Sequence, residues 1–219
     1  MHKPTAFQIL RLCVAGLVLI ALGACSVLRP TETPPPVFYS LDSPRSASTT
    51  STPVPATPAT AATLVVSPPR AAAGFDSQRI IYLREPYKLE YFANSEWVDP
   101  PARMLGPLVV KAIEGSGAFR AVIQTPGAAT GDMRLDTQII RLQHEFDTRP
   151  SHVRFTLRAY LVDDKTRRVL AWREFDADVP AASDDAYGGV VAVNKAVQTL
   201  LAELAAFCAE AARNPVPVK

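Results

Sequence analysis

Met133-Arg134-Leu135-Asp136-Thr137-Gln138-Ile139 is the stretch that decides the fold, because apolar and polar residues alternate strictly along it. A period of two places alternate side chains on opposite faces of a β-strand. The apolar phase then moves to even positions at Ile140 and Leu142. A slip of one residue turns side chains to the other face, so the pattern predicts a long strand with a β-bulge near Ile139.

The two segments that follow repeat this strand pattern. Apolar residues alternate from Val153 to Leu161 and again from Val169 to Val179, and Asp163-Asp164-Lys165-Thr166 lies between the two segments. Such a polar tetrapeptide favours a tight turn. The three segments therefore predict an antiparallel three-strand meander. Trp172 is out of phase with its apolar neighbours, so it either lies under a covering helix or contacts a partner.

A long amphipathic helix is predicted after the meander, from about Tyr187 to Ala212. Its apolar residues share one face that would cover the sheet: Val193, Val197, Leu200, Leu201, Leu204 and Cys208. Asp184-Asp185 precede this helix, where carboxylates cap amide groups and favour the helix dipole. We expect Cys208 to be a buried, inert thiol.

A second amphipathic helix is predicted before the meander. It follows Pro100-Pro101, ends at Gly115 and Gly117, and places these residues on one face: Leu105, Leu108, Val109, Ala112 and Ile113. We expect Pro107 to lie in its first turns, where a missing amide costs little.

Shorter β-prone segments complete the pattern: Val37–Leu41, Leu64–Val66, Arg79–Arg84, Tyr87–Phe92 and Phe119–Gln124. Glu85-Pro86 would join the third and fourth segments into a hairpin. The elements together predict an α/β fold. Its sheet would be mixed and largely antiparallel, with a C-terminal three-strand meander, and two main helices would cover it.

The N-terminal region resembles a bacterial lipoprotein signal. Lys3 and Arg11 precede an apolar run from Leu12 to Leu22, which is too short to span a membrane. Leu22-Gly23-Ala24-Cys25 places a cysteine directly after two small residues. Only a thiol forms the thioether to diacylglycerol, so we expect cleavage between Ala24 and Cys25. Cys25 would then carry the lipid, including a palmitate on its freed amine. A plain signal peptide with a chance cysteine is the alternative.

These features divide the chain. Residues 43–62 contain only Ser, Thr, Pro and Ala apart from Arg45 and Val54, a composition that cannot bury a core and predicts a disordered linker. We therefore expect a signal peptide at 1–24 and, at 25–62, a lipidated N-terminus with a short first strand and this linker. A folded domain at 63–213 and a tail at 214–219 would follow.

Charge and cysteine content exclude several classes of function. The formal net charge is +2, and loss of Lys3 and Arg11 with the signal peptide would leave equal numbers of acidic and basic residues. A neutral protein lacks the positive field on which sequence-independent nucleic-acid binding depends. Only Cys25 and Cys208 would remain after cleavage, so we expect no disulfide framework.

No residue set typical of catalysis is present in the sequence. It contains no G-x-S-x-G elbow, glycine-rich phosphate loop or H-x-x-x-H metal pair. His144 and His152 flank a predicted loop, where exposed polar histidines are the simpler interpretation and a catalytic base the alternative. We expect Asp136, Glu145 and Asp147 to be solvated. The sequence thus predicts a protein that is not an enzyme and needs no metal or cofactor.

Aromatic residues crowd into the segment between Tyr82 and Trp97. Aromatics are over-represented at protein interfaces, although packing of the hairpin itself accounts for some of them. We predict that Tyr82, Phe92 and Trp97 contact a partner.

Several motifs resemble the ABC-type transport auxiliary lipoproteins, which are PqiC-like lipoproteins of MCE-type lipid transport systems. They are Phe38-Tyr39-Ser40-Leu41, Leu64-Val65-Val66-Ser67-Pro68, Phe75-Asp76-Ser77-Gln78-Arg79-Ile80-Ile81-Tyr82 and Trp97. The resemblance spans nearly all of the expected mature chain. Two features depart from the family pattern: the long insert at 43–62, and Ser77 where arginine is common.

The resemblance implies a mixed α/β domain without an active site, attached to the periplasmic face of the outer membrane. Its partners would be an MCE-domain protein and the inner-membrane ABC transporter to which that protein belongs. The chain would act as a docking subunit, either alone or as a homo-oligomer. Ser26 is not the aspartate that favours inner-membrane retention in enteric bacteria, which agrees with outer-membrane sorting. Two alternatives remain: an envelope lipoprotein that binds or activates peptidoglycan-remodelling enzymes, and direct carriage of lipid within the domain.

Overall fold

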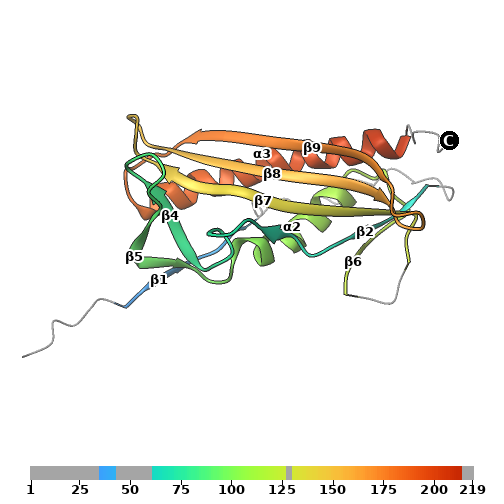
Figure 1. Cartoon of the computed structure of the whole chain (residues 1–219), viewed down its shortest axis with the longest axis horizontal. Helices are drawn as coiled ribbons and strands as arrows, with labels where there is room; N and C mark the ends of the chain where they lie inside the picture. Colours follow the sequence, from blue (N-terminus) through green and yellow to red (C-terminus); the bar gives the residue numbers. More distant parts are fainter. Residues whose placement is uncertain (1–34, 43–60, 127–129, 214–219) are drawn as a thin grey trace, which may run out of the picture. The chain divides into compact units, whose positions relative to one another are not determined.

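β7, a 13-residue strand, is the axis around which the other elements of the computed structural model are arranged (Figure 1). The structure describes residues 35–42, 61–126 and 130–213. Its strands are β1 (Val37–Tyr39), β2 (Thr63–Val66), β3 (Arg70–Ala71), β4 (Arg79–Leu83), β5 (Glu90–Trp97), β6 (Ala121–Gln124), β7 (Met133–Glu145), β8 (His152–Asp163) and β9 (Val169–Pro180). Its helices are α2 (Pro101–Gly115) and α3 (Ala186–Arg213).

The predicted meander is present as β7, β8 and β9, which pair antiparallel along their whole lengths. The register of β7 against β8 shifts between Ile139 and Arg141. This irregularity confirms the bulge expected near Ile139, because it allows buried residues to continue from odd positions to Leu142 and His144. The bulge therefore keeps one face of the strand turned toward the core.

The other edge of β7 is shared by three short parallel strands, which the sequence pattern did not reveal. Leu64 of β2 lies opposite Met133, Arg70 of β3 opposite Gln138, and Tyr82 of β4 opposite His144. Prolines at 68 and 69 separate β2 from β3, since proline offers no donor to a ladder. The segment from residue 63 to residue 83 thus runs along β7 and pairs with it at three places.

The remaining strands extend both margins of this sheet. β6 pairs parallel with β2, β5 pairs antiparallel with β4, and β1 pairs parallel with β5. The predicted hairpin is confirmed, but its second strand begins at Glu90 and reaches Trp97, later than the pattern indicated. β1 joins the same sheet although the linker at 43–60 separates it from β2.

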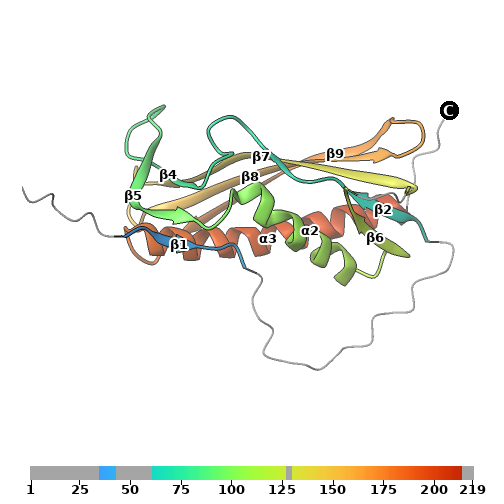
Figure 2. The ribbon, with the colours of Figure 1, turned by 90° about the horizontal axis from the view of Figure 1, so that it is seen from below.

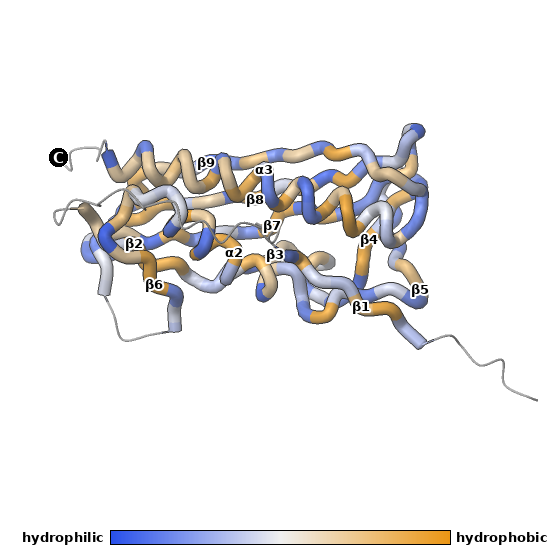
Figure 3. The backbone as a smooth tube through the Cα atoms, turned by 180° about the vertical axis from the view of Figure 1, so that it is seen from behind, coloured by the Kyte–Doolittle hydropathy of each residue, from blue (hydrophilic) through white to orange (hydrophobic). Residues whose placement is uncertain are grey.

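α2 and α3 both lie on one face of the sheet, as Figures 1 and 2 show. α3 contacts β8 and β9, α2 contacts β3 and β6, and the helices contact each other. Apolar residues that alternate along the strands face these helices, and Figure 3 shows the alternation as changing colour along the tube. The result is the predicted mixed, largely antiparallel sheet covered by two helices.

Two features of the helices differ from simple expectation. Pro107 is the seventh residue of α2 and lies in its second turn, beyond the four amides that have no intrahelical acceptor, so the expectation that its missing amide costs little is wrong. Its missing amide leaves the carbonyl of Arg103 without the usual intrahelical donor. α3 is long and apolar enough to cross a membrane by length and composition, yet it packs along the sheet and buries Val193, Leu200 and Leu204.

Candidate functional site

Buried polar residues gather where β7 ends and β8 begins, on the sheet face opposite the helices. His152 Nε2 lies 3.3 Å from Glu145 Oε2 and 3.7 Å from an Asp178 carboxylate oxygen, and its Nδ1 lies 3.7 Å from Asp147. Arg154 lies within ion-pair distance of Glu145 and Asp178. Glu145 and His152 are both only 9% exposed, so the expectation of a solvated carboxylate and an exposed loop histidine is wrong. Both residues belong to the paired strands.

Glu145, Asp147 and His152 place one donor atom each within 4.8 Å of one another, a spacing that suits a cation. The guanidinium of Arg154 lies 3.9 Å from Glu145, and Gln143 donates to the same carboxylate. Ion pairs and hydrogen bonds within the cluster therefore account for the arrangement without a metal.

His144 lies on the helix face of β7 and is 2% exposed. Its expected exposure is therefore also wrong. Its Nε2 is 2.8 Å from Ser151 Oγ, while Nδ1 has no hydrogen-bond partner among the described residues. Burial lowers the pKa of His144, although the carboxylate of Asp184 opposes this shift. Nδ1 faces Gly189, where a Cβ would lie only 2.6 Å away.

The Ser151–His144 contact does not form a reaction centre. Ser151 is 1% exposed, so a substrate has no path to its hydroxyl. The carboxylate of Asp184 accepts a hydrogen bond from the Ser151 amide rather than from the histidine ring. The hydrogen bond from the Ser151 amide to Asp184 fastens the β7–β8 turn to the segment before α3.

The start of α3 follows the sequence prediction. The amide of Gly188 donates to the Asp185 carboxylate over 2.7 Å, and this hydrogen bond is the main reason that the pKa of Asp185 is lowered. A Cβ at Gly188 would collide with the backbone oxygen of Ser183. The capping role is confirmed for Asp185, while Asp184 bonds Ser151 instead.

The three aromatic residues predicted to contact a partner do not share one environment. Tyr82 and Phe92 are half-buried, and their rings lie in tilted contact with centroids 4.6 Å apart. Trp97 is 2% exposed and belongs to the hydrophobic core. Its expected contact role is corrected, because β5 extends to Trp97 and turns its indole toward the interior.

The sequence left two roles open for Trp172, packing under a helix or contact with a partner, and its exposure decides between them. It is 62% exposed, so no helix covers it, and its ring stacks on Tyr160 of β8 at 6.4 Å. The register places the two residues directly opposite each other. The alternating pattern indicated the direction of Trp172, but its pairing with Tyr160 required knowledge of the strand register.

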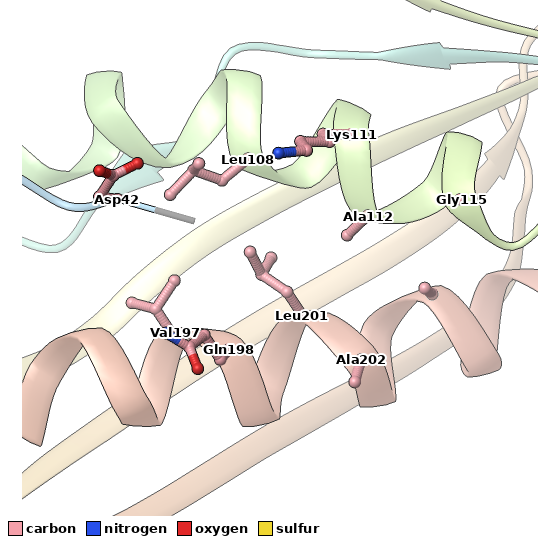
Figure 4. Close-up of a pocket in the computed structure, with 10 residues that line it drawn as sticks. Asp42, Leu108, Lys111, Ala112, Gly115, Val197, Gln198, Leu201 and Ala202 are labelled. Atoms are coloured by element: carbon pink, nitrogen blue, oxygen red, sulfur yellow. The ribbon is translucent and has the colours of Figure 1, made fainter. Parts of the chain in front are cut away.

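An apolar groove lies between α2 and α3 (Figure 4). Its volume is about 420 Å³, which falls within the range of ligand-binding clefts. Val197, Leu201 and Ala205 of α3 form a buried floor. Leu108 of α2 faces them, and Asp42 lies beside the groove. The helical patterns predicted both apolar faces but not the gap left between them.

Of the two cysteines expected in the processed chain, the structure describes Cys208. Cys208 is fully buried and burial raises its pKa to about 12, which confirms the expected inert thiol. Ala24 and Cys25, the predicted cleavage and lipid-attachment residues, lie outside the described residues.

The comparisons with known proteins agree with this architecture. A model of the family described as ABC-type transport auxiliary lipoprotein component matches residues 39–205. A crystal structure of a DUF330-family protein from Xanthomonas campestris is similar with a TM-score of 0.66 and 25% identity, covering 82% of this chain and 95% of that one. An uncharacterized protein shares the fold at 12% identity and a TM-score of 0.61, covering 80% and 99%. The comparison with curated proteins gave no match.

Fold and surfaces define a two-layer α/β domain whose accessible features, in the part of the chain that the structure describes, include an aromatic hairpin, a stacked aromatic pair and an apolar groove. The family match extends from β1 into α3 and so includes the sheet and both helices. The chain belongs to the family of ABC-type transport auxiliary lipoproteins. This family is one of transport components in the cell envelope, not of enzymes.

Proposed function

We propose that the chain is a lipoprotein anchored through Cys25 to the periplasmic face of the outer membrane, where it docks an MCE-domain protein. That protein would extend from an inner-membrane ABC transporter that moves lipids between the membranes. The family match over residues 39–205 is the observation that carries this proposal. The chain supplies position and contact, and the transporter's ATPase supplies the energy.

The docking surface that we assign is the hairpin surface, formed by β1 and the β4–β5 hairpin. Its exposed apolar residues are Val37, Phe38, Tyr87, Leu89 and Tyr91, and the rings of Tyr82 and Phe92, which contact each other, support it. Exposed apolar residues that gather in this way mark interaction surfaces. Tyr87 is fully exposed at the turn, where a large ring has no packing role in the isolated chain. A homo-oligomer would present several copies of this surface to one partner.

Anchoring follows from lipid chemistry. A single acyl chain holds a protein to a membrane only marginally, whereas two or more chains give stable attachment. Cys25→Ala removes the thiol and should leave an unprocessed or mislocalised protein with an intact domain. Membrane fractionation and the mass of the purified protein test this expectation. Unchanged fractionation and mass would refute lipidation at Cys25.

Docking is tested separately by co-purification. A tagged chain should capture an MCE-domain protein from cross-linked membranes. Binding to peptidoglycan, or activation of a peptidoglycan synthase, in place of MCE capture would favour the alternative envelope role.

A further inference from the structure

The groove between α2 and α3 has the shape and chemistry of a binding site for a hydrocarbon chain, which forms no hydrogen bonds. Its floor residues Val197, Leu201 and Ala205 are at most 8% exposed. They span two turns of α3, a length of about 12 Å. Small residues help to create the space, since Ala112 of α2 points toward α3 (Figure 4) and Ala202 and Ala205 of α3 also line the groove.

The lining excludes ligands that need many polar partners. Only three lining side chains carry polar groups, namely Asp42, Lys111 and Gln198. An extended peptide, a sugar or a nucleotide would bury donors and acceptors that helix surfaces cannot satisfy, at a cost for each group. An acyl chain buries only methylene groups and carries no such cost.

The charged groups of the lining indicate the headgroup. Neither Lys111 nor Asp42 forms an ion pair within the described ranges, although both line the groove. The position of Asp42 is fixed, because its amide donates to Asn194 Oδ1 over 2.8 Å and Asn194 also bonds Ser40. One ammonium and one carboxylate beside an apolar groove complement a headgroup that carries both a phosphate and an amine.

We propose that this groove binds one acyl chain of a zwitterionic phospholipid, with the phosphate directed to Lys111 and the amine to Asp42. The proposal deepens the proposed lipid-transport function by placing a lipid contact on this chain itself. It does not depend on capture of an MCE-domain protein, so the two can fail separately.

The test uses the full-length processed protein in phospholipid vesicles and a photoreactive probe, lysophosphatidylethanolamine with a diazirine on its palmitoyl chain. Mass spectrometry should map the photoproducts to α2 and α3 residues that line the groove. Ala202→Trp fills the groove and should reduce labelling at least tenfold. Val191→Trp is the matched control, because Val191 is 44% exposed on the same helix outside the groove and should leave labelling unchanged.

A second set of variants tests the assignment of the headgroup. Lys111→Gln and Asp42→Asn should each reduce labelling by the zwitterionic probe several-fold, but not labelling by a monoacylglycerol with the same chain. Lys195→Gln, an exposed change on α3 outside the groove, is the control. Melting curves confirm that each variant is folded. Labelling that ignores Ala202→Trp, or photoproducts scattered over the surface, would overturn the proposal. A finding that residues 43–60 of the chain itself occupy the groove would also overturn the proposal.

Discussion

Gly189 shows how one residue sets the distance between the sheet and its main helix. Its Cα lies so close to the His144 ring that a Cβ would approach Nδ1 to 2.6 Å, with two ring carbons at 3.2 Å. A ring buried in a strand cannot move away freely. Glycine is therefore required here for close approach of α3 to β7, although it costs helix propensity.

Gly189→Ala should lower the free energy of unfolding by about 1–2 kcal/mol, because overpacking outweighs the gain in helix propensity. Denaturant titration of the purified domain measures the change. Gly115→Ala is the matched control, since a Cβ there would meet nothing within 4 Å. It should leave stability unchanged or slightly higher, and an equal loss in both variants would argue against the close-approach explanation.

His144 should make stability depend on pH in the mildly acidic range. Burial lowers its pKa below the ordinary value of 6.5, so the unfolded chain binds this proton more readily than the folded chain. The stability that the neutral ring contributes is complete above about pH 6.5 and is lost as the pH falls below that value. Urea midpoints between about pH 5 and 7 should therefore decrease toward acid.

His144→Phe supplies the comparison for this prediction. The variant should be less stable at every pH because Ser151 loses its partner, yet its midpoints should change less between the same two pH values. An identical slope in both proteins would show that other groups cause the dependence.

At the level of elements, sequence patterns predicted those structures that depend on residues close together in the chain. The alternation from Met133 to Val179 gave the meander and its bulge, and helical spacing gave α2 and α3. The parallel contacts of β2, β3 and β4 with β7 were not predictable, because two-to-five-residue strands carry no signal of which distant edge they join.

The same limit applied to the candidate site. Trp97, His144 and His152 were placed at the surface because the pattern assigned β5 and the β7–β8 turn different boundaries from those observed. Once the strands extend to these residues, their burial follows from the face they occupy. Cys208 and the cap at Asp185 were predictable because both depend on helix geometry alone.

Pro107 provides a prediction about α2. Pro107→Ala restores an amide that can donate to the carbonyl of Arg103, and alanine is the best helix former. Because Pro107 is exposed, no core contact is lost, and the free energy of unfolding should rise by roughly 1 kcal/mol or more. Thermal unfolding measures this change. Glu114→Ala, an exposed change in the last turn, is the control and should have little effect.

At the level of the whole molecule, helices cover one sheet face and leave the hairpin surface exposed at one margin. β1 is part of that margin, and the chain upstream of it leads to Cys25. The 11 residues between Cys25 and β1, Ser26–Pro36, reach about 38 Å at most when fully extended. If Cys25 is lipidated, the hairpin surface works close to the membrane.

The most direct measurement is quantitative co-purification of an MCE-domain protein with the tagged, full-length lipoprotein from cross-linked membranes. Docking through the hairpin surface predicts specific capture by the native chain and reduced capture by Tyr87→Ala, whose melting temperature should stay close to the native value because Tyr87 is fully exposed. Trp97→Ala is the contrast, since loss of this buried ring should cost about 3–5 kcal/mol of stability. Reproducible absence of an MCE-domain protein, or equal capture by the native chain and Tyr87→Ala, would contradict docking through this surface.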